Sequence, residues 1–199
     1  MERSAISGSR VGYARWCSAA RFVLGQADAA ALALQRELSL GSYRTAWRMA
    51  RIIREALAAT EWPLLSGDVE FCDVNLATPP ARRLAAWFAV ERRSAAPGLI
   101  RAWRGGTDLR VDFGRVATVV GAGASVITPE AGWFRGLRES GLRQRGEALG
   151  EADALPAAMK TAGAFRRMLV ERRHHGIAAK SVDSYLGEFV FRHNAAVLG

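Results

Sequence analysis

The side chains with the clearest chemical potential are arginines that recur on one face of an expected helix. Within residues 42–59, Arg44, Arg48 and Arg51 follow one another at helical spacing and form one stripe, with Arg54 beside it. The guanidinium group is planar and always charged, and its geometry matches phosphate oxygens and base edges. This stripe therefore predicts contact with nucleic acid. The alternative is a solvated arginine face on a structural helix.

The same helix carries a second, apolar stripe. Its members are Ala46, Ala50, Ile53 and Leu57. A DNA-recognition helix needs this division, because one side must pack against the protein while the other enters the major groove. Tyr43 and Trp47 lie near the N-terminal end of the helix. We expect these two aromatic residues and the four arginines to contact double-stranded DNA.

The overall charge agrees with this expectation. The chain of 199 residues has 28 basic and 19 acidic residues, a net charge of +9. Only Lys160 and Lys180 are lysines, so nearly all of the positive charge is arginine. An arginine-rich protein of this kind is typical of nucleic-acid binding. Codon bias in a GC-rich genome is the alternative explanation for the arginines.

Two further helices are expected before the arginine-bearing helix. Residues 1–11 have no apolar period and predict a loose tail, whereas residues 13–24 repeat apolar side chains at helical spacing. Asp28 is expected to cap a second helix that reaches Leu38, and Ser42 to cap the third. Ser39-Leu40-Gly41 forms the turn between them. Residues 12–62 are thus expected to form a helix-turn-helix DNA-binding region.

After Pro63 the pattern changes to short apolar runs typical of strands, followed by helices. Strands are expected at residues 69–73, 84–91, 99–103 and 125–128, with β-branched residues also at 115–120. Residues 109–113 could be a further strand or the start of the next element. Helices are expected at residues 133–140, 158–173 and 181–196. Residues 63–199 therefore predict an α/β (α+β) domain with a mixed sheet flanked by helices.

The cysteine count and hydropathy exclude several classes of protein. Cys17 and Cys72 are the two cysteines, too few for a disulfide framework or a four-cysteine zinc site. No apolar run is long enough to span a membrane, and no secretory hydrophobic segment is evident at the start. We expect a cytoplasmic protein without a membrane partner.

Several segments resemble the ISXO-like group of DDE insertion-sequence transposases, in the same order along the chain. The segments are ALQREL at residues 33–38, GSYRTAWRM at 41–49, LSGDVE at 65–70, AVE at 89–91, RRHHG at 172–176 and YLGEFVFRHN at 185–194. The resemblance implies a helix-turn-helix followed by an RNase H-like domain. It also implies DNA phosphoryl transfer by two divalent ions, Mg²⁺ or Mn²⁺, held by carboxylates.

The acids that this chemistry requires are missing at the matched positions. Read without a gap, the first catalytic position of the family falls on Cys72; the second, which follows a threonine, falls on Pro129 after Thr128, and the third falls near Phe165, counted back from His174-His175. Hard cations prefer oxygen ligands, so these residues predict an inactive domain that needs no cofactor. Asp68 and Glu70 share a strand face with Cys72 and are expected to be a solvent-side pair. The resemblance then implies a transposase-derived DNA-binding protein that is catalytically inactive.

Two alternatives remain open from the resemblance. A one-residue bulge could turn Asp73 onto the face of Cys72, with Glu130 as the second acid, and give an active transposase that binds Mg²⁺ or Mn²⁺. The chain could instead pair with itself or with an intact transposase subunit and regulate it.

Overall fold

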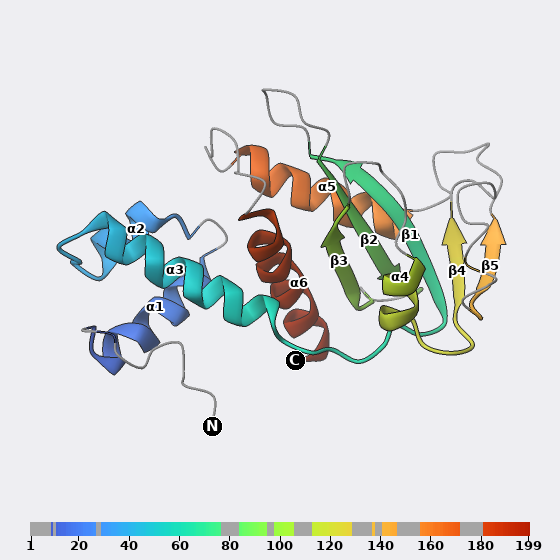
Figure 1. Cartoon of the computed structure of the whole chain (residues 1–199), viewed down its shortest axis with the longest axis horizontal. Helices are drawn as coiled ribbons and strands as arrows, with labels where there is room; N and C mark the ends of the chain where they lie inside the picture. The colour runs from blue at the N-terminus through green and yellow to red at the C-terminus, as the bar shows by residue number, and fades with distance from the viewer. Residues whose placement is uncertain are drawn as a thin grey trace. The chain divides into compact units, whose positions relative to one another are not determined.

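The computed structural model describes residues 9, 11–26, 29–76, 84–94, 98–105, 113–128, 137, 141–146, 156–171 and 181–199. The chain divides into two compact units, Met1–Thr60 and Glu61–Gly199 (Figure 1). Expectations for residues 77–83, 109–112, 129–136 and 138–140 lie outside the described residues. Of the helix expected at residues 133–140, only Leu137 is described.

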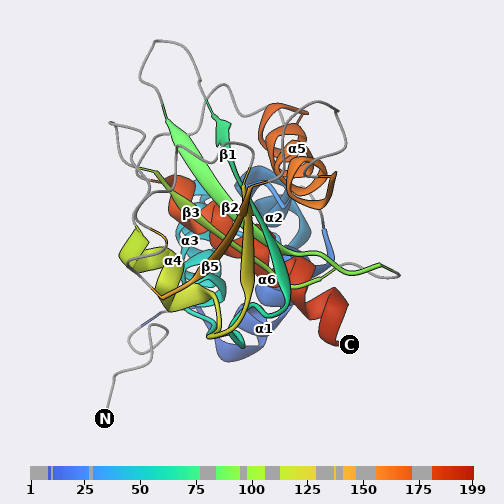
Figure 2. The ribbon, with the colours of Figure 1, turned by 90° about the vertical axis from the view of Figure 1, so that its right-hand side faces the viewer.

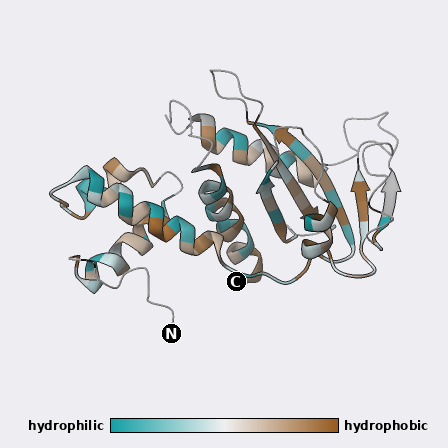
Figure 3. Ribbon diagram, in the orientation of Figure 1, coloured by the Kyte–Doolittle hydropathy of each residue, from teal (hydrophilic) through white to brown (hydrophobic). Residues whose placement is uncertain are grey.

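The described residues of the N-terminal unit form three helices, as expected. They are α1 (Tyr13–Gly25), α2 (Ala31–Glu37) and α3 (Tyr43–Ala58). Each contacts the other two around a small apolar core that includes Trp16, Leu34 and Met49. Along α3, hydrophilic and hydrophobic residues alternate at helical spacing (Figure 3). The expectation that Asp28 caps the second helix is wrong, because Ala30 occupies the N-cap position.

A short turn joins α2 to α3 and sets where α3 begins. Ser39 adopts a positive φ of 48°, a left-handed conformation that L residues rarely take. The backbone N–H of Leu40 donates to Gln35 O, and the side-chain amide of Gln35 donates back to Leu40 O at 3.2 Å. These two bonds satisfy carbonyl groups at the end of α2 and in the turn.

The second unit contains a five-stranded sheet with the order β3-β2-β1-β4-β5. The strands are β1 (Asp68–Asn75), β2 (Ala85–Glu91), β3 (Ile100–Arg104), β4 (Ser125–Thr128) and β5 (Arg143–Gly146). β1 is antiparallel to β2, β2 is antiparallel to β3, and β4 is parallel to both β1 and β5. Only β2 therefore runs against the other strands. The expected mixed α+β class is confirmed.

Helices cover both faces of this sheet. On one face, α4 (Phe113–Val119) packs through Val116 against a cluster that includes Phe71 and Trp87. On the other face, α5 (Pro156–Glu171) and α6 (Val182–Leu198) pack against Cys72 and Phe88. Figure 2 shows α4 and α5 on opposite sides of the strands. The sheet is thus the middle of three layers.

Two elements differ from the sequence expectation. The β-branched run at residues 115–120 lies mostly in helix α4. Val116 and Val120 are four residues apart, so a helix places them on one face, and both pack in the cluster on this side of the sheet. Strand β5 has the sequence Arg-Gln-Arg-Gly, which carries no alternating apolar pattern. It is a strand because it pairs in register with β4.

Asn194 of α6 closes one edge of the sheet. Its side-chain oxygen accepts from the N–H of Ile100 at 2.9 Å, and its amide donates to the carbonyl oxygen of the same residue at 3.0 Å. His193 lies 2.9 Å from Gly98 O through its Nε2 atom. An edge strand with free backbone groups invites pairing with another chain. These contacts occupy backbone groups on the outer edge of β3.

Glu91 joins the end of β2 to the start of β1. One carboxylate oxygen accepts from the N–H of Ser66 at 2.9 Å, and the other accepts from the N–H of Leu99 at 3.1 Å and from Arg93 at 2.7 Å. Burial alone would raise the pKa of Glu91, but these hydrogen bonds outweigh it and lower the pKa. The ionised form is therefore the one that stabilises the fold.

Replacing Glu91 by glutamine should destabilise the second unit by about 1–3 kcal/mol, because the amide cannot accept all of these bonds. The pKa of Glu91 is lowered in the fold, so its contribution is present above the usual glutamate pKa of about 4 and is lost as the pH falls. Urea unfolding of parent and E91Q should therefore converge in acid. The control is E61Q, at an exposed position of the same unit. Equal losses in E61Q and E91Q would contradict the assignment.

Candidate nucleic-acid interface

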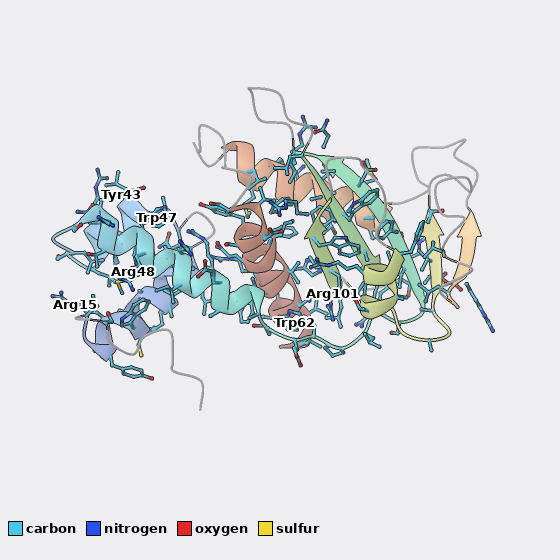
Figure 4. All side chains as sticks on the ribbon, in the orientation of Figure 1. Arg15, Tyr43, Trp47, Arg48, Trp62 and Arg101 are labelled. Atoms are coloured by element: carbon cyan, nitrogen blue, oxygen red, sulfur yellow. The ribbon has the colours of Figure 1, made fainter. Side chains whose placement is uncertain are left out.

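One side of α3 is a solvent-exposed surface of aromatic and basic residues. Tyr43 is 52% exposed and Trp47 44% exposed, and Arg44 and Arg48 are also exposed. Figure 4 shows Tyr43, Trp47 and Arg48 along this helix, with Arg15 on α1. The opposite side of α3 is buried through Ala46, Met49 and Ala50. We call Tyr43, Arg44, Trp47, Arg48 and Arg51 the α3 surface.

The arginines of the α3 surface are not equivalent. Within the part of the chain that the structure describes, the side chains of Arg44 and Arg48 form no hydrogen bond or ion pair. Arg51 is paired: its Nε atom is 2.7 Å from Glu55 Oε1, and its guanidinium carbon is 5.8 Å from the centre of the Trp47 ring. Arg44 and Arg48 therefore present the two charges that are most available to an anionic partner.

Arg54 does not belong to this surface, contrary to the sequence expectation. Its side chain is 7% exposed, and its Nη2 atom donates to Ala29 O at 2.7 Å. Arg54 follows Ile53 and lies four residues after Ala50, so it borders the buried stripe of α3. Its stem packs in the unit while its guanidinium group holds the chain that enters α2.

Of the positions that the resemblance matches to catalytic acids, Cys72 lies on β1 and Phe165 on α5. All seven residues from Val69 to Asn75 pair with β2 in an unbroken register from Glu91 to Ala85. The one-residue bulge that the active-enzyme alternative requires is therefore absent from this part of β1. Because a strand alternates its faces, Asp73 points to the side of Phe71 and Trp87, opposite to Cys72. Glu130 and Pro129 lie outside the described residues.

Two of the three matched positions lie together in the apolar core. Cys72 and Phe165 belong to the same buried cluster between the sheet and α5. The centre of the Phe165 ring is 5.7 Å from the centre of the Phe88 ring and 5.2 Å from that of the Phe189 ring. Burial raises the pKa of the Cys72 thiol to about 12, and the charges of Asp73 and Glu70 add to this effect. The thiol is consequently protonated at neutral pH and behaves as a small apolar group.

Glu70 of β1 is directed toward α5, and both of its carboxylate oxygens have hydrogen-bond partners. Its side chain is fully buried rather than on the solvent side, which corrects the sequence expectation. Oε1 is 2.7 Å from Arg92 Nε, and Oε2 accepts from the N–H of Ala158 at 2.8 Å. Ala158 lies in the first turn of α5, where backbone N–H groups lack partners within the helix. Glu70 therefore fixes the start of α5 onto the sheet.

This set of side chains does not fit Mg²⁺ or Mn²⁺. Hard cations need several oxygen ligands, whereas Cys72 offers a protonated thiol, Phe165 offers no donor and Glu70 is engaged. Within the described residues, no three histidine, cysteine or acidic side chains converge so that they could hold a metal ion.

The segment at residues 185–194 has a structural use in this fold. Leu186 and Val190 face the core, and Asn194 binds the edge of β3. Glu188 is fully buried and accepts from Arg192 at 2.9 Å. Sequence reasoning missed the anchoring roles of Glu70 and Asn194, because the backbone groups of Ala158 and Ile100 that they bind are 88 and 94 residues away.

No helix in the described part of the chain is both long and apolar enough to cross a membrane.

Replacing Cys72 by aspartate should destabilise the second unit by about 3 kcal/mol or more, since the new carboxylate is buried among aromatic rings. Calorimetry should detect no stoichiometric Mg²⁺ binding. Cys72→Ala is the control for lost volume and should cost about 1 kcal/mol. The difference between the two variants should shrink as the pH falls, because the buried carboxyl group then becomes neutral. Parent-like stability of C72D together with Mg²⁺ binding would show that an acid site survives.

No family model matches this chain, and no curated protein matches its sequence.

Proposed function

We propose that the protein binds double-stranded DNA through its N-terminal helical unit. The observation that carries the proposal is the pair Arg44 and Arg48, exposed on a helix whose other side is buried. An α-helix fits the major groove, and guanidinium groups beside it can reach phosphates of both strands. The net charge of +9 adds a long-range attraction for DNA.

The second unit is proposed to be an RNase H-like domain derived from an insertion-sequence transposase. Its support is the order of elements: three antiparallel strands in succession, then β4 placed beside β1, then helices after β5. The sequence segments that resemble the transposases run through both units. The unit is proposed to lack strand-transfer activity, because Cys72 and Phe165 form part of an apolar core.

The active-enzyme alternative has no support from Asp73. It would need this carboxylate beside Cys72, and the unbroken pairing of β1 with β2 directs it to the other face. A regulatory role as partner of an intact transposase subunit is a separate outcome, and binding to such a subunit without DNA would identify it.

The double substitution R44A/R48A should weaken binding to a 20-base-pair duplex at least tenfold, because each arginine contributes a phosphate contact. The slope of log affinity against log salt should become shallower by about 2, one contact for each arginine removed. Fluorescence anisotropy at several salt concentrations measures both quantities.

The matched control is R166A/R167A, which removes the same charge from exposed positions on α5. Its effect should be much smaller. Equal losses in the two double variants would mean that overall charge, and not the α3 surface, drives binding.

A further inference from the structure

Trp47 is a large apolar side chain in the middle of a charged, exposed surface. Arg44 precedes it by three residues and Arg48 follows it directly. Its side chain is 44% exposed, whereas the apolar residues on the other side of α3 are buried. Exposed aromatic residues beside arginines are characteristic of binding surfaces.

Two residues along α3 hold this ring in place. Trp47, Arg51 and Glu55 lie at successive intervals of four residues, so they are stacked along one side of the helix. Glu55 Oε1 is 2.7 Å from Arg51 Nε, and the guanidinium carbon of Arg51 is 5.8 Å from the Trp47 ring centre. An exposed ion pair and a cation–π contact of this kind are each weak, and together they favour one ring position severalfold.

The chemistry of the indole indicates what it contacts. Its faces are apolar and its single N–H donor is uncharged, so it binds phosphate more weakly than the arginines around it, which have five donors on a cationic group. In the major groove, the apolar feature of the base edges is the 5-methyl group of thymine. A ring held between phosphate-binding arginines on a groove-binding helix is placed to contact that methyl group.

We infer that Trp47 is a specificity-determining residue that contacts thymine methyl groups in the major groove. Arg51 and Glu55 are positioning residues for the ring, while Arg44 and Arg48 supply binding that is independent of sequence. This inference rests on the proposed DNA binding and adds to it a division of labour within the α3 surface.

The test compares an AT-rich 20-base-pair duplex with the same duplex in which deoxyuridine replaces thymidine, which removes only the methyl groups. The parent should bind the thymine duplex about three- to fivefold more tightly, the value expected for burying one methyl group. Trp47→Ala should bring the ratio of the two affinities to about one. R44A/R48A should weaken binding to both duplexes and leave the ratio unchanged. A matching unfolding midpoint for parent and W47A verifies that the fold is intact.

Glu55→Gln distinguishes positioning from simple charge. It releases Arg51 from its ion pair, so affinity for both duplexes should rise while the thymine-to-uracil ratio falls toward one. Glu37→Gln removes the same charge from an exposed position on α2. It should raise affinity without changing the ratio. Equal ratios in the two variants would overturn the role of Glu55 and Arg51.

The outcomes separate this inference from the proposed function. Equal parent affinities for the two duplexes, with binding that R44A/R48A still weakens, would overturn the thymine contact and leave DNA binding in place. Equal or tighter binding to the matching single strand would also overturn it, because a stacking site would then be indicated. Absence of binding to either duplex would overturn both proposals.

Discussion

The second unit depends on a single constraint, the uninterrupted pairing of β1 in the centre of the sheet. β1 pairs with β2 on one side and β4 on the other, and its side chains alternate between two apolar clusters. Because the strand period is two, an insertion of one residue would exchange the side chains of the two faces. The register therefore decides at once which residues form each core and which face receives Asp73.

The polar side chains buried around this sheet are used to connect elements. Glu70 holds the start of α5, Glu91 joins β2 to the segment before β1, and Asn194 binds the edge of β3. Each of these groups has hydrogen-bond partners, which is the condition for burying a carboxylate or an amide without a large cost. Glu70, which shares a strand face with the matched catalytic position, is thus a structural group, and the position itself is filled by the thiol of Cys72 within an apolar core.

In the N-terminal unit, the charged side chains of α3 remain at the surface. The core of three short helices is small, so α3 buries one side and leaves a broad exposed side on which cations meet no counter-charge except at Glu55 within the described residues. In the proposed complex with DNA, these arginines exchange contacts with water and small ions for contacts with a fixed array of phosphates. The exposed side of α3 contributes little to the stability of its own unit, because its side chains are not buried there. That side is therefore accessible to a partner.

The sequence by itself determined the elements whose signals are local. It predicted the helical periods of α1 and α3, the strands β1 to β4 and the stripe of Arg44, Arg48 and Arg51. Each of these patterns is formed by residues that are close together in the sequence. Only the tertiary structure decided that Arg54 is buried and that residues 113–119 are helical. It also decided that Arg143–Gly146 is a strand and that Glu70 is a buried anchor. The reason is physical: each of these outcomes depends on a partner far away in the chain, and no local pattern encodes the energy of a contact with it.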